Sequence, residues 1–136
     1  MSESSYQRAI KDDTVEVLDA TRSWGKFSTL FSRPDCKVKH LHVSANTGMS
    51  FQRHFKRQEL WFVQKGEIEV RWSARYEFDP ERNYSRKLLK KFDWWYVPLQ
   101  GWHQIINPTD EPATVIEVQF GEQCVEDDIE RLSYYD

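Results

Sequence analysis

The stretch that decides the fold is Gly48-Met49-Ser50-Phe51-Gln52-Arg53-His54-Phe55-Lys56-Arg57-Gln58-Glu59, which continues as Leu60-Trp61-Phe62-Val63 and reaches Gly66. Side chains alternate between two faces along a strand, so we expect Gln52 and His54 to project to the same side. Glu59 opens a second, apolar strand and adds a carboxylate to this pair. The segment therefore predicts neighbouring strands whose polar side chains converge.

A further ligand-type residue lies downstream, in Trp95-Tyr96-Val97-Pro98-Leu99-Gln100-Gly101-Trp102-His103. His103 stands just past a turn, and Asn107-Pro108 closes the segment. One amide oxygen, two imidazoles and one carboxylate can bind a divalent metal and leave positions open, as a catalytic site requires. We expect one ion, with zinc first and iron, cobalt, nickel or manganese as alternatives, held by Gln52, His54, Glu59 and His103.

A rival pair of imidazoles occurs in His40-Leu41-His42. No acidic residue follows it at the corresponding spacing. Leu41 and Val43 also make the opposite face of this strand the better core face. Loss of metal on His40→Ala and His42→Ala would nevertheless favour this pair over His54 and His103.

The two main segments resemble the two-part signature of the cupins, whose first motif runs Gly, five residues, His-x-His, three or four residues, Glu, six residues, Gly. Gln52 takes the place of the first histidine here. The second motif, Gly, five residues, Pro-x-Gly, two residues, His, three residues, Asn, is matched by Pro98, His103 and Asn107. The resemblance implies an all-β fold, the double-stranded β-helix or jelly-roll barrel.

Three positions depart from the cupin signature. Asn46 and Phe92 stand where the motifs have glycine, and Gly101 lies one place late. Asparagine tolerates a positive φ, whereas a bulky residue such as Phe92 opposes the turn that glycine would make. The short strands and frequent turns support the all-β prediction independently of the motifs.

Within the cupins, the chain resembles the type II phosphomannose isomerases from about Arg22 to Arg131. The matching segments are Arg22-Ser23-Trp24-Gly25, Lys37-Val38-Lys39-His40-Leu41-His42-Val43, Ser50 to Trp61, Ile116-Glu117-Val118-Gln119-Phe120-Gly121 and Glu126-Asp127-Asp128-Ile129-Glu130-Arg131. This resemblance implies interconversion of mannose 6-phosphate and fructose 6-phosphate, which needs a Lewis acid at the oxygens and a base at the carbon acid. Phe55, Lys56 and Leu60 depart from the family pattern.

Several residues are candidates for roles around that metal. Under the isomerase hypothesis, Lys56, Glu117 and Arg131 could handle protons or bind an anion, and Arg131 matches the family's tail arginine. Lys39, Gln119 and Trp102 are candidate substrate contacts. Glu117, Gln119 and Lys39 line a pocket only if their strand faces point inward, and otherwise face solvent. Tryptophan rings can stack on a sugar, but they also pack cores and dimers.

Two other functions use the same residues. A cupin that binds a sugar or sugar nucleotide without isomerising it would fit the departures at Phe55, Lys56 and Leu60. An oxidative metal cupin uses similar ligands but does not account for the resemblance of the tail. Exchange of the C2 proton of mannose 6-phosphate separates the isomerase from the binding protein.

Length and composition bound the remaining possibilities. The 136 residues predict residues 1–13 as a flexible lead-in and 14–136 as one barrel domain. Lysine and arginine total 19 against 22 acidic residues, which argues against nucleic acid as partner and leaves anionic small molecules possible; the resemblance implies a small sugar phosphate. Two cysteines, and the lack of an apolar signal or spanning segment, predict a cytoplasmic protein away from membranes.

The remaining expectations concern the two ends and the assembly. We expect an edge strand over 14–18 and an extended hairpin or excursion within 73–91 with Pro80 near its tip. The acidic start of 126–132, with an arginine near its end, predicts a short helix that places Arg131 at the pocket mouth. Exposed sheet edges and abundant aromatic residues predict a homodimer, with contacts at 15–18 and Trp24.

Overall fold

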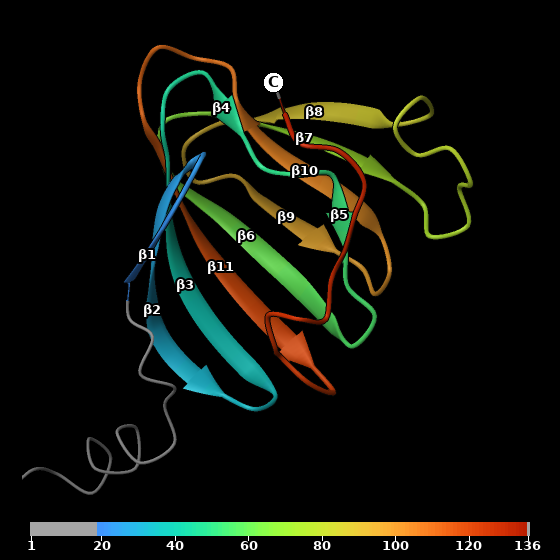
Figure 1. Ribbon diagram of the computed structural model, residues 1–136. Helices are drawn as coiled ribbons and strands as arrows, with labels where there is room; N and C mark the ends of the chain where they lie inside the picture. The colour runs from blue at the N-terminus through green and yellow to red at the C-terminus, as the bar shows by residue number, and fades with distance from the viewer. Residues whose placement is uncertain (1–18, 136) are drawn as a thin grey trace, which may run out of the picture.

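The computed structural model describes residues 19–135, which form two antiparallel sheets packed face to face (Figure 1). The first sheet has the strand order β1 (Asp19–Arg22), β2 (Gly25–Arg33), β3 (Cys36–Val43), β11 (Ala113–Gly121), β6 (Arg57–Lys65), β9 (Trp94–Val97). The second has the order β12 (Glu130–Arg131), β5 (Gln52–Arg53), β10 (Trp102–Asn107), β7 (Ile68–Ser73), β8 (Ser85–Leu89), and β4 (Thr47–Gly48) also pairs with β10. The all-β jelly-roll prediction is confirmed.

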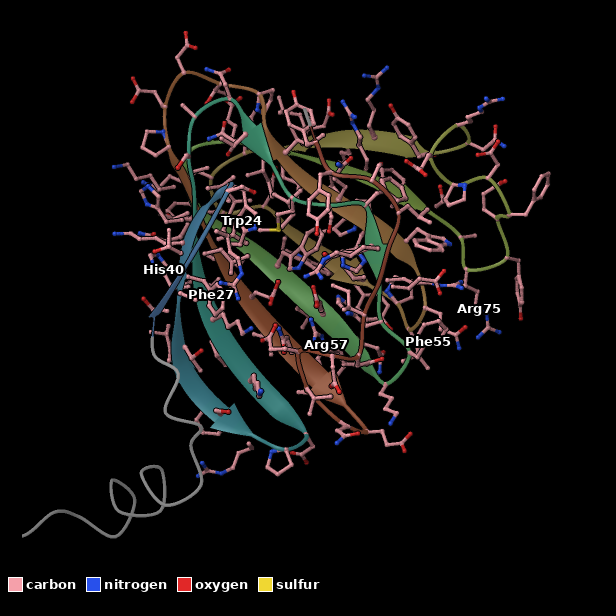
Figure 2. All side chains as sticks on the ribbon, viewed as in Figure 1. Trp24, Phe27, His40, Phe55, Arg57 and Arg75 are labelled. Carbon is pink, nitrogen blue, oxygen red and sulfur yellow. The ribbon has the colours of Figure 1, made fainter. Side chains whose placement is uncertain are left out.

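The core lies between the two sheets and follows the period-2 alternation of their strands. On β3 the inward face carries Leu41 and Val43, which pack with buried residues of both sheets such as Val63 and Ile105. His40 lies on the other face of β3, at the outer left of the barrel (Figure 2).

The prediction of a C-terminal helix over 126–132 is wrong. Residues 19–135 contain no helix, and Glu130–Arg131 instead form β12, which pairs with β5. The backbone N–H of Leu132 donates to the carbonyl of Phe51 at 2.9 Å, and the N–H of Phe51 donates to the carbonyl of Ser133 at 2.8 Å. Pairing with an open sheet edge therefore outweighs the local charge pattern that favours a helix turn.

Other expectations fall partly outside the structure. The edge strand at 14–18, the domain boundary near residue 13 and most of the proposed dimer contacts lie outside the described residues. The hairpin formed by β7 and β8 runs from Ile68 to Leu89 and so begins before the predicted range 73–91; Pro80 lies in the loop between these strands, where it is buried and its carbonyl accepts a hydrogen bond from Ser73. Among residues 19–135, no helix is long and apolar enough to cross a membrane.

The departures from glycine at the motif turns do not prevent the turns. Asn46, Phe92 and Gln100 have φ of 55°, 73° and 62°. Gln100, rather than Gly101, adopts the left-handed conformation after Pro98, although a side chain makes that conformation costly. The tertiary structure therefore imposes the turns at Phe92 and Gln100, whereas Asn46 tolerates the left-handed conformation by itself.

Candidate functional site

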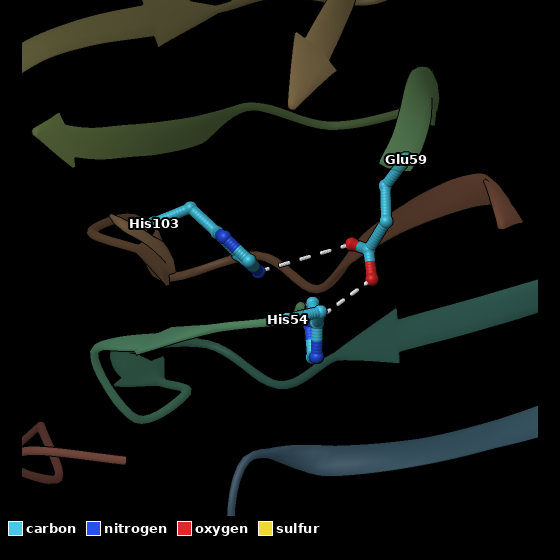
Figure 3. Close-up of side chains that lie close together, drawn as sticks. All are labelled: His54, Glu59 and His103. Carbon is cyan, nitrogen blue, oxygen red and sulfur yellow. Dashed lines mark ion pairs between the residues drawn. The ribbon is translucent and has the colours of Figure 1, made fainter. Parts of the chain in front are cut away.

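Three predicted metal ligands meet in the centre of the barrel. His54 follows β5, Glu59 lies on β6 and His103 lies on β10, and all three are at least nine-tenths buried. One ligand-type atom from each lies within 4.8 Å of the others. Figure 3 shows both imidazoles beside the Glu59 carboxylate, with Nε2–oxygen distances of 3.2 Å for His54 and 3.9 Å for His103. We call these three residues the metal-ligand cluster.

Backbone carbonyls orient both imidazoles of the cluster. Nδ1 of His54 lies 2.7 Å from the carbonyl oxygen of Asp128, and Nδ1 of His103 lies 3.0 Å from that of Gly101. Since a carbonyl only accepts, each Nδ1 is assigned the hydrogen, and each Nε2 is the atom that would bind a metal through its lone pair when the ring is neutral. Burial lowers the pKa of His103 to about 4, so its ring is neutral near pH 7.

Glu59 supplies the negative charge of the cluster. Its carboxylate accepts hydrogen bonds from Trp61 Nε1 at 3.0 Å and from Arg57 Nε at 3.1 Å. Burial alone would raise the pKa of Glu59, but the hydrogen bond and charge of His54, with His103 and Arg57, hold it well below its usual range. The carboxylate is therefore ionised and already oriented.

These donors fit a divalent ion. The Nε2 atom of His103 is buried and has no hydrogen-bond partner among residues 19–135, as expected of an atom that binds a metal ion. The predicted fourth ligand, Gln52, has its Nε2 3.5 Å from His54 Nε2, while its oxygen accepts a hydrogen bond from Ser50. Its amide would have to turn over to present oxygen to the ion.

Arg57 belongs to this site although the sequence prediction did not include it. Its Nη2 lies 3.3 Å from His54 Nε2, and its Nη1 donates to the carbonyl of Val125 at 3.0 Å. Figure 2 shows Arg57 in the interior between the two sheets. The available signal was strand alternation, because Arg57, Glu59 and Trp61 share one face of β6.

A cavity of about 300 Å³, the main cavity, lies beside the metal-ligand cluster and is lined by both Gln52 and Arg57. The predicted residues Lys39, Glu117, Gln119 and Arg131 also line it, as does Trp24. The inward alternatives for Lys39, Glu117 and Gln119 therefore agree with the structure. Arg131 reaches this cavity from β12, not from a helix.

Glu117 is the buried acid of the main cavity. Gln119 Nε2 donates to its Oε1 at 2.7 Å, while the amide oxygen of Gln119 has no partner within the described part of the chain. Burial, together with repulsion from Glu59, raises the pKa of Glu117 to about 7, although Lys39 and Arg57 oppose the shift. This carboxyl group can gain or lose a proton near neutral pH.

Comparison with known proteins agrees with this geometry. Residues 11–134 match the family described as mannose-6-phosphate isomerase C-terminal. The chain belongs to this family. It is 31% identical to the alginate biosynthesis protein AlgA of Pseudomonas putida over 90% of its own length, and 34% identical to the mannose-1-phosphate guanylyltransferase ManC of Salmonella typhimurium over 82%. It covers only 23% and 21% of those relatives.

Solved structures support the jelly-roll fold of this family member. CapF with a bound inhibitor aligns with a TM-score of 0.72 at 17% identity, covering 88% of this chain and 35% of that one. Oxalate decarboxylase from Bacillus subtilis aligns with a TM-score of 0.71 at 15% identity, covering 86% and 30%. At these identities the likeness establishes the cupin fold and nothing about activity.

The structure keeps other predicted residues apart from the main cavity. Lys56 is exposed, and its Nζ donates to Gln123 at 3.2 Å. Trp102 stacks on Phe51 with 6.3 Å between ring centroids and lies under Arg53, so its ring packs and does not line the main cavity. Lys56 and Trp102 therefore lie outside the main cavity, although Trp102 lines another cavity together with His103.

The family departures and the rival histidines also lie elsewhere. Phe55, Lys56 and Leu60 are all exposed, so their difference from other family members does not alter the lining of the main cavity. His40 and His42 lie on the outward face of β3 and are not part of the metal-ligand cluster. Alternation with the buried Leu41 and Val43 accounts for their position.

Proposed function

We propose that this domain is a metal-dependent isomerase that interconverts mannose 6-phosphate and fructose 6-phosphate. The observation that carries the proposal is the position of Glu117, a buried acid with its pKa raised to about 7, in a cavity that Gln52 and Arg57 of the metal site also line. An aldose-ketose exchange needs a proton acceptor effective near neutral pH beside an electrophilic centre. Both requirements have candidate residues around one cavity.

Each residue then has a defined task. A divalent ion held by His54, Glu59 and His103, with Gln52 as a fourth ligand, would supply the Lewis acid for the oxygens at C1 and C2. Glu117 would carry the proton between these carbons, and Gln119 would fix the carboxyl group by its 2.7 Å hydrogen bond. The buried guanidinium of Arg57 would stabilise negative charge that develops on the enediol oxygens.

The relatives support a sugar-related role without defining the reaction. The family description names mannose-6-phosphate isomerase, and similar proteins carry names in alginate biosynthesis and in mannose-1-phosphate guanylyl transfer. This chain spans less than a quarter of the length of these two relatives. Their whole activities therefore enter only as support for the proposal.

A test follows the C2 proton of mannose 6-phosphate by NMR in deuterated buffer, with protein shown to contain one metal per chain. We expect wild-type exchange, and a decrease on the order of 10²- to 10⁴-fold in Glu117→Gln with metal content unchanged. Glu122→Gln, a change of an exposed acid, is the matched control and should exchange like wild type. Fully metallated wild-type protein without exchange would exclude the isomerase.

A second candidate is a sugar-phosphate-binding domain without turnover. The observation that favours it is Arg57, which already contacts both His54 Nε2 and Glu59 Oε2, so the polar core has an internal cation. In that case the protein would bind mannose 6-phosphate, measured by calorimetry, while the C2 proton stayed in place. The same pair of measurements thus separates the two candidates.

A further inference from the structure

A second cavity of about 250 Å³, the small cavity, adjoins the main cavity. Both are lined by Arg22, Phe27, Lys39 and Glu126. Only the small cavity is also lined by Thr29, Ser32 and Lys37. Its walls therefore combine two hydroxyl groups with three cationic side chains and one carboxylate.

A β-bulge in β2 produces this arrangement. The pairing with β3 shifts between Thr29 and Phe31, so that Thr29 stands opposite Lys39 and Ser32 opposite Lys37. Uninterrupted alternation would send Phe31 inward after Thr29 and turn Ser32 outward. The extra residue reverses the alternation and puts a small hydroxyl where a phenyl ring would fill the space. The small cavity thus depends on this bulge.

The small cavity holds donors that lack sufficient acceptors. Ser32 is completely buried, and its Oγ has no hydrogen-bond partner within residues 19–135. Lys39 is buried on β3 and pairs with Glu126. Lys37 lies near the same carboxylate, and both burial and the charge of Lys39 lower its pKa. A buried polar donor without an acceptor is costly, so an anion placed here would be stabilised.

Glu126, the acidic residue that lines the small cavity, is not held there by burial. The Glu126 side chain is 62% exposed, while the side chain of its partner Lys39 is only 6% exposed. Glu126 can rotate into water at small cost because most of its surface is already hydrated, whereas Lys39 cannot follow. Lys39 would then need a replacement anion to avoid a buried, unpaired charge.

We propose that the small cavity is the phosphate subsite, in which the phosphate of the sugar phosphate replaces Glu126 as the partner of Lys39 and accepts hydrogen bonds from Ser32 and Lys37. A phosphate monoester carries close to two negative charges and three acceptor oxygens, so it can serve all three donors where one carboxylate cannot. This inference rests on the proposed function for its ligand. The sugar would extend from the small cavity into the main cavity toward the metal-ligand cluster.

The test measures binding rather than turnover. Calorimetric titrations with mannose 6-phosphate and with neutral mannose compare wild type with Ser32→Ala and Glu126→Gln. Ser32→Ala should weaken binding of mannose 6-phosphate about tenfold, because a hydrogen bond to a charged group is lost. Glu126→Gln should tighten it about threefold to tenfold, because the internal competitor is removed. Mannose binding should not change in either variant.

The controls are Ser28→Ala, on the other face of β2, and Glu122→Gln, an exposed acid of the same C-terminal segment as Glu126. The melting temperature of Ser32→Ala should equal or exceed that of wild type, because the change removes an unpaired buried hydroxyl. Weaker binding in a protein of equal or higher stability would exclude a general folding defect as the cause.

Two results would overturn the inference. Binding by Ser32→Ala as tight as that by Ser28→Ala would exclude the subsite, and binding by Glu126→Gln no tighter than that by Glu122→Gln would exclude the exchange of anions. Failure of the proposed isomerase is distinguishable, since protein that shows the expected binding changes but no C2 exchange retains the subsite and loses only the reaction. Exchange of the C2 proton without the expected binding changes would retain the isomerase and exclude the phosphate subsite.

Discussion

The metal-ligand cluster and the small cavity are both polar regions inside one barrel, and each contains an unpartnered buried atom, His103 Nε2 and Ser32 Oγ. They differ in what fixes their charges. In the cluster, carbonyls of Asp128 and Gly101 orient the imidazoles, and the Glu59 carboxylate is buried with its donors. In the small cavity the counter-charge is the exposed Glu126. The cluster is therefore preorganised, whereas the small cavity can exchange its anion.

The largest expected effect comes from removing a ligand of the cluster. His103→Ala should lower the affinity for a divalent ion by more than about a hundredfold, because even the outer partners of metal ligands are worth roughly 10- to 100-fold. Metal content per chain, measured by elemental analysis after dialysis, should fall from about one to nearly zero. His54→Ala should behave in the same way.

His40→Ala is the matched control, since it removes an imidazole from the outward face of β3. Its metal content should equal that of wild type. Full retention of metal in both His54→Ala and His103→Ala would show that the cluster is only a buried hydrogen-bonded core, and the contrast with the small cavity would then disappear.

Glu117 reports on both regions, because Glu59 of the cluster raises its pKa and Lys39 of the small cavity lowers it. The folded pKa of about 7 lies above the usual carboxyl value of 4.5, so between pH 4.5 and 7 the folded state binds more protons than the unfolded state. The contribution of Glu117 to stability therefore falls as pH rises through this range.

Glu117→Gln removes this titration, so it should gain stability relative to wild type as pH rises from 4.5 to 8, by about 3 kcal/mol at most. Urea denaturation of both proteins at each pH measures the difference. The opposite pH dependence of His103, whose pKa is depressed to about 4, is common to both proteins and cancels. A difference that stays constant with pH would contradict the raised pKa.

Sequence reasoning recovered the cluster better than the small cavity, and the two explain why. His54, Glu59 and His103 follow from motif spacing and strand alternation, which are both local patterns. The small cavity depends on a bulge that reverses the side-chain alternation in β2. The residue types between Thr29 and Ser32 do not predict this bulge. The alternation of β6 places Arg57 on the same face as Glu59, but the sequence analysis did not distinguish Arg57 from the charged residues around it.

The C-terminal segment shows a second limit. Its acidic start and its arginine are compatible with a short helix, but the open edge at β5 offers backbone hydrogen bonds that make it a strand. That edge exists only once the barrel has formed. The carbonyl of Asp128, which orients His54, was for the same reason beyond prediction from local sequence.

Arg57 provides a way to sharpen the contrast between the two regions. Its guanidinium contacts His54 Nε2 and Glu59 Oε2, and a metal ion would have to compete with these contacts. Arg57→Gln should therefore bind the ion about tenfold more tightly, because it removes the repulsion between the guanidinium and the metal ion, which we take as roughly 1.4 kcal/mol. Competition with a zinc chelator measures the affinity.

Arg53→Gln is the control for Arg57→Gln, because Arg53 pairs with Glu130 at 3.2 Å and lies over the ring of Trp102 rather than against the cluster. Its zinc affinity should match that of wild type. Weaker binding by Arg57→Gln would instead mean that the guanidinium supports the ligand geometry more than it repels the ion.

The smallest expected effect concerns the turn that supports the cluster. Gln100 has φ 62°, its N–H donates to the carbonyl of His54 at 2.9 Å, and the next residue, Gly101, accepts the hydrogen bond of His103. Gln100→Gly should relieve the left-handed strain of about 1 to 2 kcal/mol, less the extra chain entropy that glycine loses on folding. We expect a net gain of about 0.5 to 1 kcal/mol in the free energy of unfolding, measured by urea denaturation, and an unchanged zinc affinity.

The control is Gln100→Ala, which keeps the Cβ atom and should gain no stability. Equal stability of the glycine and alanine variants would mean that the turn is unstrained, and a loss of zinc affinity in Gln100→Gly alone would mean that the strained turn itself holds His54 and His103 in position.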